Sequence, residues 1–149
     1  MLEAAAMRRY VQDGRNPVTH DFIDEAVRNG DRCYALFDGD TLASYSWFAT
    51  QPVRLVGADD RLVLRVSAAY AFMYNGFTLP ARRGQRLYAV GMGEALEWHL
   101  SRGLKGLVGC IASCDFGSSR WFERAGCLEV GRSVSTILRH RRSEFSECR

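Results

Sequence analysis

One segment limits the possible folds more than any other: an apolar run, a proline, an arginine-rich turn and then a helix. The apolar run covers residues 62–79, Pro80 ends it, and a turn with three arginines around Gly84 follows. The predicted helix covers residues 84–102, with apolar and small residues at helical spacing, and Gly103 ends it. Strand, basic turn and helix form a phosphate-binding arrangement, because unpaired N–H groups at a helix N-terminus attract an anion.

The rest of the chain alternates between helical and strand patterns. The pattern predicts helices over 2–12 and 19–30, strands over 33–37 and 41–49 around the turn Asp38-Gly39-Asp40, a strand over 107–112, a helix over 118–124, and one strand or a tight pair over 128–138. We therefore expect a mixed α/β or α+β fold, with helices on a central sheet.

Length and composition fit one folded domain over residues 1–149. Apolar residues make up 47% and charged residues 25% of the chain, which is close to the globular average and excludes a disordered chain. No uninterrupted apolar stretch approaches the ~20 residues of a membrane span, because Arg65 and Asn75 interrupt the run over 62–79. Glu3 and the pair Arg8-Arg9 are unlike a signal peptide. We expect a cytoplasmic protein with no membrane partner.

Cysteine usage argues against a metal site. The five cysteines are an odd number and include no Cys-x-x-Cys pair, and none of the three histidines lies at ligand spacing to a cysteine. We expect reduced thiols and no bound metal.

Basic side chains gather in the C-terminal half. Residues 61–149 carry fourteen of the twenty bases and seven of the seventeen acids. Such a half attracts a nucleotide cofactor or a nucleic acid. A nucleic acid is the weaker alternative, although Arg139-His140-Arg141-Arg142 is basic, because the net charge is only +3 and no recognition helix or RNA-binding motif is present.

Two segments resemble motifs of one enzyme family. The segment Thr78-Leu79-Pro80-Ala81-Arg82-Arg83-Gly84-Gln85-Arg86-Leu87-Tyr88 resembles the acyl-CoA-binding motif of the GNAT superfamily of N-acetyltransferases, Val-x-Pro, two residues, then Arg-Gly-x-Gly-(Ile/Leu)-(Gly/Ala). Residues 115–127, from Asp115 to Cys127, resemble the later motif Asn-x-x-Ser-x-x-x-Tyr-Glu-Lys-x-Gly-Phe. The resemblance extends over residues 30–140 and is that of a divergent bacterial member. It implies a mixed central sheet flanked by helices.

The resemblance also implies a cofactor, acetyl-CoA or another acyl-CoA, and a small-molecule amine or amino acid as acceptor. Backbone groups of Thr78 and Leu79 would pair with the pantetheine arm, and Asp115 and Ser118 would contact that arm or orient the following helix. The side chain of Arg82, Arg83 or Arg86 would meet a phosphate. Backbone N–H groups would cradle the pyrophosphate, namely those of Arg83, Gly84, Gln85, Arg86, Leu87 and Tyr88.

The sequence departs from the family pattern at six points, one of which is Tyr88 in place of the final small residue of the turn. Arg86 replaces the second glycine of the turn, Asp115 replaces the asparagine, and Phe122 replaces a tyrosine that often protonates the CoA thiolate. No acidic residue lies in residues 62–79, where many members carry the base. The first strand of the fold has no clear counterpart before Cys33, so it is absent or supplied by a partner chain; the oligomeric state is open.

Other residues are candidates for the missing catalytic groups. Tyr74 and Asn75 precede the turn and would border the acyl site, where a tyrosine could relay protons; the alternative for Tyr74 is a core aromatic residue. Asp115 would serve as a base if burial raised its pKa, and otherwise caps a helix.

Three functions stay open at this point. The first is an acyl-CoA-dependent N-acyltransferase that works by direct attack of the amine, with acyl carrier protein as an alternative donor that docks on the basic surface. The second is a non-catalytic CoA-binding or interaction module with the same fold. The third is nucleic-acid binding.

Overall fold

The computed structural model describes residues 1–13, 17–54, 63–112 and 115–131. They fall into two compact units, Met1–Val53 with Leu64–Gly109, and Arg54–Val63 with Cys110–Arg149. Each unit is described by itself, and the single domain expected over residues 1–149 stays a prediction.

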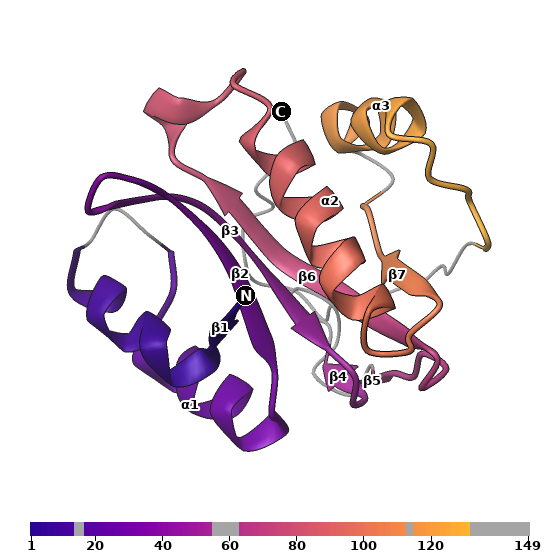
Figure 1. Ribbon diagram of the computed structural model, residues 1–149, viewed down its shortest axis with the longest axis horizontal. Coiled ribbons are helices and arrows are strands. Elements are labelled where there is room, and N and C mark those ends of the chain that lie inside the picture. Colours follow the sequence, from indigo (N-terminus) through magenta and orange to yellow (C-terminus); the bar gives the residue numbers. More distant parts are fainter. Residues whose placement is uncertain (14–16, 55–62, 113–114, 132–149) are drawn as a thin grey trace, which may run out of the picture. The chain divides into compact units, whose positions relative to one another are not determined.

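The first unit is built on a mixed five-stranded sheet (Figure 1). In the order β1-β2-β3-β6-β7, its strands are β1 (Leu2–Glu3), β2 (Arg32–Asp38), β3 (Thr41–Ala49), β6 (Tyr70–Thr78) and β7 (Gly106–Gly109). The first three pairings are antiparallel and the β6–β7 pairing is parallel. A separate two-stranded sheet joins β4 (Val53–Arg54) to β5 (Val63–Leu64). The hairpin predicted around Asp38-Gly39-Asp40 and the mixed sheet are confirmed.

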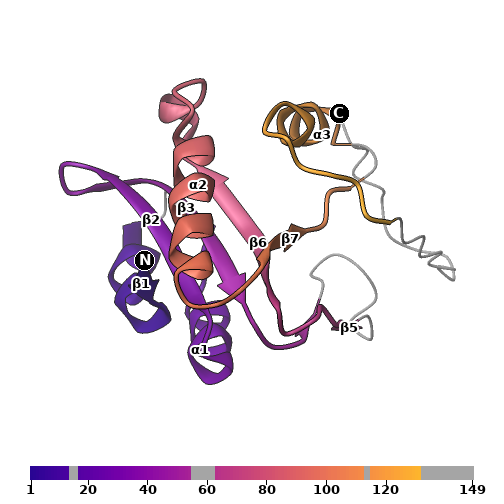
Figure 2. The same cartoon turned by 45° about the vertical axis from the view of Figure 1, so that its right-hand side comes forward.

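Helices cover both faces of this sheet (Figures 1 and 2). Tyr45 and Trp47 of β3 pack with the 3-10 helix η1 (Ala4–Asp13) and with α1 (His20–Asn29) in one buried cluster. Phe48, which points to the opposite face, packs against His99 of α2 (Leu87–Leu100) with the two rings tilted and their centroids 5.2 Å apart. Because both faces are covered, β3 is buried from residue 42 to residue 49.

The chain begins differently from the prediction. Instead of a helix over 2–12, Leu2 and Glu3 pair with Cys33 and Arg32 of β2, and a 3-10 helix follows. The Glu3 carboxylate also forms an ion pair with Arg32. The first strand is therefore present, although the sequence shows no clear counterpart for it. A strand of two residues is too short for a periodic pattern to reveal.

Local signals at both ends of α1 behave as predicted. The Thr19 hydroxyl accepts a hydrogen bond from the N–H of Phe22 at 3.2 Å, and Gly30 ends the helix in the left-handed region at φ 72°. The N–H of Asp31 then donates to the Ala26 carbonyl at 2.9 Å, which completes a Schellman motif. This motif fixes the backbone from which the Asp31 side chain projects.

The bounds of later elements differ from the prediction: α2 and β7 are shorter, and α3 (Phe116–Arg124) begins two residues earlier. Residues 80–82 form a separate 3-10 turn, η2 (Pro80–Arg82), so α2 begins only at Leu87. The second unit contains α3. Residues 128–131 are not a strand, and the remainder of the strand or pair predicted over 128–138 lies outside the described residues. In the part of the chain that the structure describes, no helix has the length and apolar character needed to cross a membrane.

His99 makes the stability of the first unit depend on pH. Its ring is 3% exposed, and burial, helped by the nearby Arg102 charge, lowers its pKa below the ordinary 6.5. The unfolded chain therefore takes up a proton before the folded chain does, and the free energy of unfolding should fall as the pH drops below about 6.5. Urea denaturation between pH 8 and pH 5 measures this slope.

His99→Phe keeps the aromatic contact with Phe48 and should remove that part of the pH dependence. His20→Phe, at an exposed histidine, is the matched control and should leave the slope unchanged. Equal slopes in wild type and His99→Phe would contradict the prediction.

Candidate functional site

The sheet forks where β6 and β7 separate. Their parallel pairing runs from Tyr70 and Gly106 to Met73 and Gly109. There β7 ends, whereas β6 continues through residues 74–78. Among the described residues, no strand pairs with this part of β6 on the β7 side. An unpaired strand edge presents backbone N–H and C=O groups to an extended ligand.

A β-bulge lies immediately beyond the fork. Trp47 of β3 pairs with Tyr74 of β6, and Tyr45 pairs with Phe77. Between these two pairs β3 advances by two residues and β6 by three. Asn75 takes up the extra residue with a left-handed φ of 45°, which asparagine tolerates better than most side chains. A bulge releases a peptide unit from the ladder. The structure thus places both predicted residues of β6, Tyr74 and Asn75, at an irregular point next to the open edge.

The end of β6 is fastened to β3. The Ser44 hydroxyl lies 2.9 Å from the Thr78 hydroxyl, and the Leu79 N–H donates to the Ala43 carbonyl at 3.0 Å. The Thr78 carbonyl accepts a hydrogen bond from Arg83 Nε at 3.3 Å. Because β3 engages the Leu79 N–H, residues 74–78 form the edge that is available to a ligand.

The turn after β6 has the backbone expected of a glycine-rich loop. Gly84 has φ 78°, and Arg86, directly before the first residue of α2, has φ 59°. Both positions are glycines in the GNAT pattern, so Arg86 keeps the backbone of that pattern and adds an exposed guanidinium. Arg83 and Gln85 are exposed in the same turn, and Leu87 opens the helix.

Arg82 differs from the other two arginines of the turn. Its guanidinium forms an ion pair with Asp38 at the end of β2. This contact ties the turn to the β2–β3 hairpin. The sequence leaves open which arginine would meet a phosphate, and the ion pair favours Arg83 and Arg86, whose side chains are more exposed.

Tyr88 packs against the bulged part of β6. A Cβ atom added to Gly76 would lie 2.5 Å from Cε2 of the Tyr88 ring, so only glycine permits this contact. The Tyr88 hydroxyl reaches Met73 Sδ at 3.7 Å, beside the last β6–β7 pair. The ring therefore lies along β6 at the fork, on the face that α2 covers.

The opposite face of β6 holds a pair that sequence reasoning missed. The Tyr74 hydroxyl donates to Asp31 Oδ2 at 2.5 Å, and Asp31 is only 3% exposed. Burial raises the Asp31 pKa above its ordinary 3.8 and outweighs the lowering by the Tyr74 hydrogen bond, and the Glu25 charge adds a smaller rise. The Tyr74 pKa is raised as well, mainly by burial and by this hydrogen bond to Asp31.

The signal for Asp31 in the sequence is weak. Asp31 directly follows Gly30, which ends α1, and it lies 43 residues before Tyr74 in the sequence. No sequence pattern connects two residues at that distance. Strand β6 has no acidic residue of its own, so its carboxylate comes from the turn between α1 and β2.

Asp115 and Ser118 lie in the second unit, where they cap α3. The Asp115 carboxylate accepts hydrogen bonds from the Ser118 N–H at 3.0 Å and the Ser118 hydroxyl at 2.6 Å. These bonds, the side-chain one first, lower the Asp115 pKa, and the residue is exposed. The condition for a base at Asp115, a pKa raised by burial, is therefore not met. Asp115 is instead the cap of α3, the alternative role considered for it from the sequence.

Three cysteines lie in the described residues: Cys33 is buried, and Cys110 and Cys127 are exposed. Within the described ranges, no group of three or more His, Cys, Asp or Glu side chains is placed to hold a metal ion. Cys33 is buried, and burial raises the pKa of its thiol to about 12, so it stays protonated.

The mixed sheet, the bulge at its fork and the basic turn that leads into α2 match the fold of GNAT-type acetyltransferases. Solved structures match it. The structure of AAC(6')-Iy with the bisubstrate analog CoA-S-monomethyl-acetylneamine has a TM-score of 0.63, 13% identity and 89% coverage of both chains.

Two further structures show how widely this fold is used. The aminoglycoside 6'-N-acetyltransferase AAC(6')-IG from Acinetobacter haemolyticus has a TM-score of 0.61 and 10% identity, over 91% of this chain and 94% of that one. A transcriptional regulator from Bacillus halodurans C-125 also has a TM-score of 0.61, at 13% identity, over 82% and 78%. No protein-family model matches the sequence, and no curated protein is significantly similar to it. The chain has the GNAT fold, and its activity has to be argued from its own residues.

Proposed function

We propose that the chain is a cytoplasmic acyl-CoA-dependent N-acyltransferase, with an acetyl group as the preferred acyl group. The acceptor is the primary amine of a small molecule or amino acid. The observation that carries the proposal is the open edge of β6 at residues 74–78, which leads directly into the turn with left-handed Gly84 and Arg86. The structures of AAC(6')-Iy with CoA and with a bisubstrate analog support this assignment.

The residues of the turn fit a pyrophosphate. The Arg83 N–H donates to the Pro80 carbonyl at 3.3 Å, so the N–H groups of residues 84–88, at the start of α2, would hold the phosphates where the helix dipole favours negative charge. Arg83 and Arg86 add two exposed guanidinium groups, and we assign Arg82 to holding the turn through Asp38. The pantetheine arm would lie along residues 74–78 like an added strand.

The bulge and the open edge suit direct transfer. The bound cofactor supplies a thioester that an amine can attack. The peptide released at Asn75 would donate a hydrogen bond to the carbonyl oxygen as negative charge develops there. Strand β6 would thus position donor and acceptor, which is the main requirement of this reaction.

A non-catalytic CoA-binding module is the second candidate. Phe122 has no hydroxyl to protonate a thiolate, and Asp115 is engaged in capping α3. The fold also occurs in a protein described as a transcriptional regulator. This candidate predicts CoA binding without transfer to any amine.

Thermal unfolding with CoA, acetyl-CoA and a long-chain acyl-CoA tests the proposal. A ligand at ~100 times its dissociation constant adds about 2.7 kcal/mol to the free energy of unfolding, a rise of several degrees in Tm. The largest rise with acetyl-CoA supports an acetyltransferase, and the largest rise with the long chain favours a long-chain donor. No rise with any of them removes CoA as donor and leaves acyl carrier protein.

Removing the two exposed arginines should weaken CoA binding. Arg83→Ala with Arg86→Gly deletes both guanidinium groups, and glycine rather than alanine keeps the left-handed backbone at position 86. We expect a loss of about 2 kcal/mol, roughly thirtyfold in Kd, measured by calorimetry. Arg28→Ala with Arg65→Ala makes the same charge change at exposed positions outside the turn and should leave Kd within about threefold. An equal loss of CoA affinity in the two double variants would contradict the assignment of Arg83 and Arg86 to phosphate binding.

A further inference from the structure

We propose that Tyr74 and Asp31 form a proton relay on the acceptor side of β6, in which Tyr74 takes the amine proton and Asp31 receives the Tyr74 proton. The inference rests on the proposed function and deepens it, because it supplies the base that β6 itself lacks. Tyr74 is the residue that would touch the acceptor, and Asp31 is a positioning residue that acts through it.

The geometry of the pair favours proton transfer over a packing role. The Schellman motif at the end of α1 fixes the Asp31 backbone, and the Tyr74 hydroxyl lies 2.5 Å from Asp31 Oδ2. The other oxygen, Asp31 Oδ1, is buried and has no hydrogen-bond partner among the described residues. A buried carboxylate with an unsatisfied oxygen costs stability, so packing alone gives no reason to keep it.

The position of the pair connects it to the open edge. Tyr74 is the first residue of β6 beyond the last β6–β7 pair and the last one before the left-handed Asn75. Its side chain belongs to the face covered by η1 and α1, within 6.0 Å of the Phe22 ring, whereas α2 covers the other face. Because Tyr74 is half-buried and Asp31 fully buried, a proton from the surface reaches Asp31 through the Tyr74 hydroxyl.

In the transfer step one proton moves from the amine through Tyr74 to Asp31. As the amine nitrogen forms the C–N bond, its proton passes to Tyr74 Oη while the Tyr74 O–H proton passes to Asp31 Oδ2. The C–S bond breaks with the electron pair on sulfur, and CoA leaves as a thiolate. Tyr74 ends as a neutral phenol and Asp31 as a neutral acid. After the product leaves, the proton returns to water along the same path.

The charges around the pair suit this role. Glu25 of α1 faces Asp31 with a negative charge, and Cys33 of β2, which faces Tyr74, is a neutral thiol. Burial and the Glu25 charge both raise the pKa of Asp31, which makes its carboxylate a stronger base. The raised pKa of Tyr74 keeps the phenol neutral, so it passes a proton on instead of ionising.

The first test needs no cofactor. Carbon-13 NMR of protein labelled at the aspartate carboxyl groups gives the titration of Asp31, assigned by its loss in Asp31→Asn. We expect Asp31 to titrate above 3.8, and higher still in Tyr74→Phe, because that variant lacks the hydrogen bond that lowers its pKa. Titration at the ordinary value, or no change in Tyr74→Phe, would overturn the relay.

The second test is transfer from acetyl-CoA to the best acceptor in a panel of primary amines. Asp31→Asn and Tyr74→Phe should each lower kcat by about a hundredfold, with KM for acetyl-CoA unchanged, and the double variant should be no slower than either. The ratio of wild-type to Asp31→Asn activity cancels the titration of the amine. It should rise with pH through the Asp31 titration seen by NMR and then level off.

Tyr45→Phe is the matched control. The Tyr45 hydroxyl is buried on the same face, in the neighbouring strand, and finds no hydrogen-bond partner in the described part of the chain. Its removal should leave kcat and the pH profile unchanged. Asparagine has the shape of aspartate, so Asp31→Asn carries the test if Tyr74→Phe does not fold.

The failures of the two proposals are distinguishable. An active wild type with an unchanged pH profile in folded Asp31→Asn overturns the relay alone. CoA binding without transfer to any amine overturns both the transferase and the relay.

Discussion

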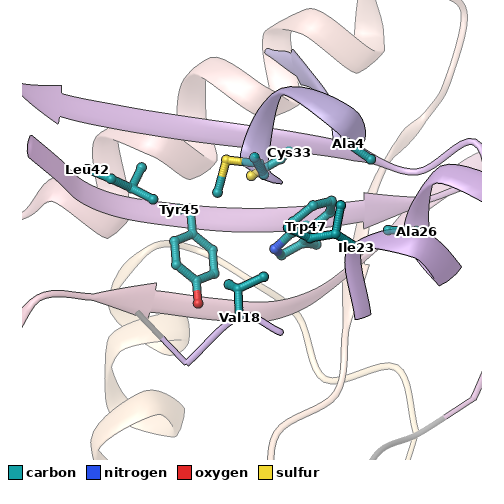
Figure 3. Close-up of a cluster of buried hydrophobic side chains, with 9 residues drawn as sticks. Ala4, Val18, Ile23, Ala26, Cys33, Leu42, Tyr45 and Trp47 are labelled. Atoms are coloured by element: carbon teal, nitrogen blue, oxygen red, sulfur yellow. The ribbon is translucent and has the colours of Figure 1, made fainter. Parts of the chain in front are cut away.

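Trp47→Ala is expected to lower the free energy of unfolding by about 3–5 kcal/mol. Trp47 is 0% exposed on β3, the strand buried on both faces, and Figure 3 shows it beside Ile23 of α1. The Phe22 ring meets it edge-on at 5.0 Å. Small domains have about 5–15 kcal/mol in total, so this one substitution would remove a large part of the stability. Urea denaturation, followed by far-UV circular dichroism, measures the loss.

Trp98→Ala is the matched control for that substitution. Trp98 is only half-buried on α2, where its ring lies under the Arg102 guanidinium at 3.7 Å. Its removal leaves the α1 face of the sheet intact and should cost roughly 1–2 kcal/mol. Equal losses for the two tryptophans would show that the centre of the core does not lie between β3 and α1.

Elements with local signals could be predicted from the sequence. The β2–β3 hairpin follows from alternation around Asp38-Gly39-Asp40, and α1 follows from Thr19 and Gly30 at its two ends. The turn after β6 is equally local, because proline, arginines and glycine occur within seven residues. In each case the residues that determine the backbone conformation are close in sequence to the turn or helix end that they form.

Features that depend on tertiary contacts could not be predicted. The two residues of β1 are a strand only because β2 offers them an edge. The bulge at Asn75 appears only when β6 is set in register against β3. The Asp31–Tyr74 bond joins residues 43 positions apart, and no periodicity connects them. Asp115 was a candidate base because a motif marked its position, whereas no motif marks Asp31 in the turn after α1.

The candidate site was predicted in its backbone better than in its side chains. Motif spacing pointed to the turn after β6, and at position 86 of that turn an arginine adopts the left-handed φ that the glycine of the motif would allow. The same spacing gave no sign that Arg82 pairs with Asp38, which lies in another strand. Nor did it show that Tyr88 needs Gly76, since that contact crosses from α2 to β6.

That contact leads to the last prediction, that Gly76→Val lowers the free energy of unfolding by roughly 3 kcal/mol. A Cβ atom at this position would lie 2.5 Å from Tyr88 Cε2 and 2.9 Å from the Tyr88 hydroxyl, so the ring must shift from its place on β6. A displaced ring would disturb residues 74–78, where the pantetheine arm is proposed to lie. CoA affinity should therefore fall about tenfold along with stability. Denaturation and calorimetry measure the two effects.

A second substitution separates the clash from a general intolerance of valine. In a Tyr88→Ala background the ring is gone, so Gly76→Val should cost at least about 1 kcal/mol less than it does in the wild type. Gly106→Val is the control on β7, because a Cβ there would meet the Tyr70 ring at an ordinary 3.5 Å. Additive losses in the Gly76→Val, Tyr88→Ala double variant would mean that the two residues do not contact each other. The open edge of β6 would then not depend on the Tyr88 ring.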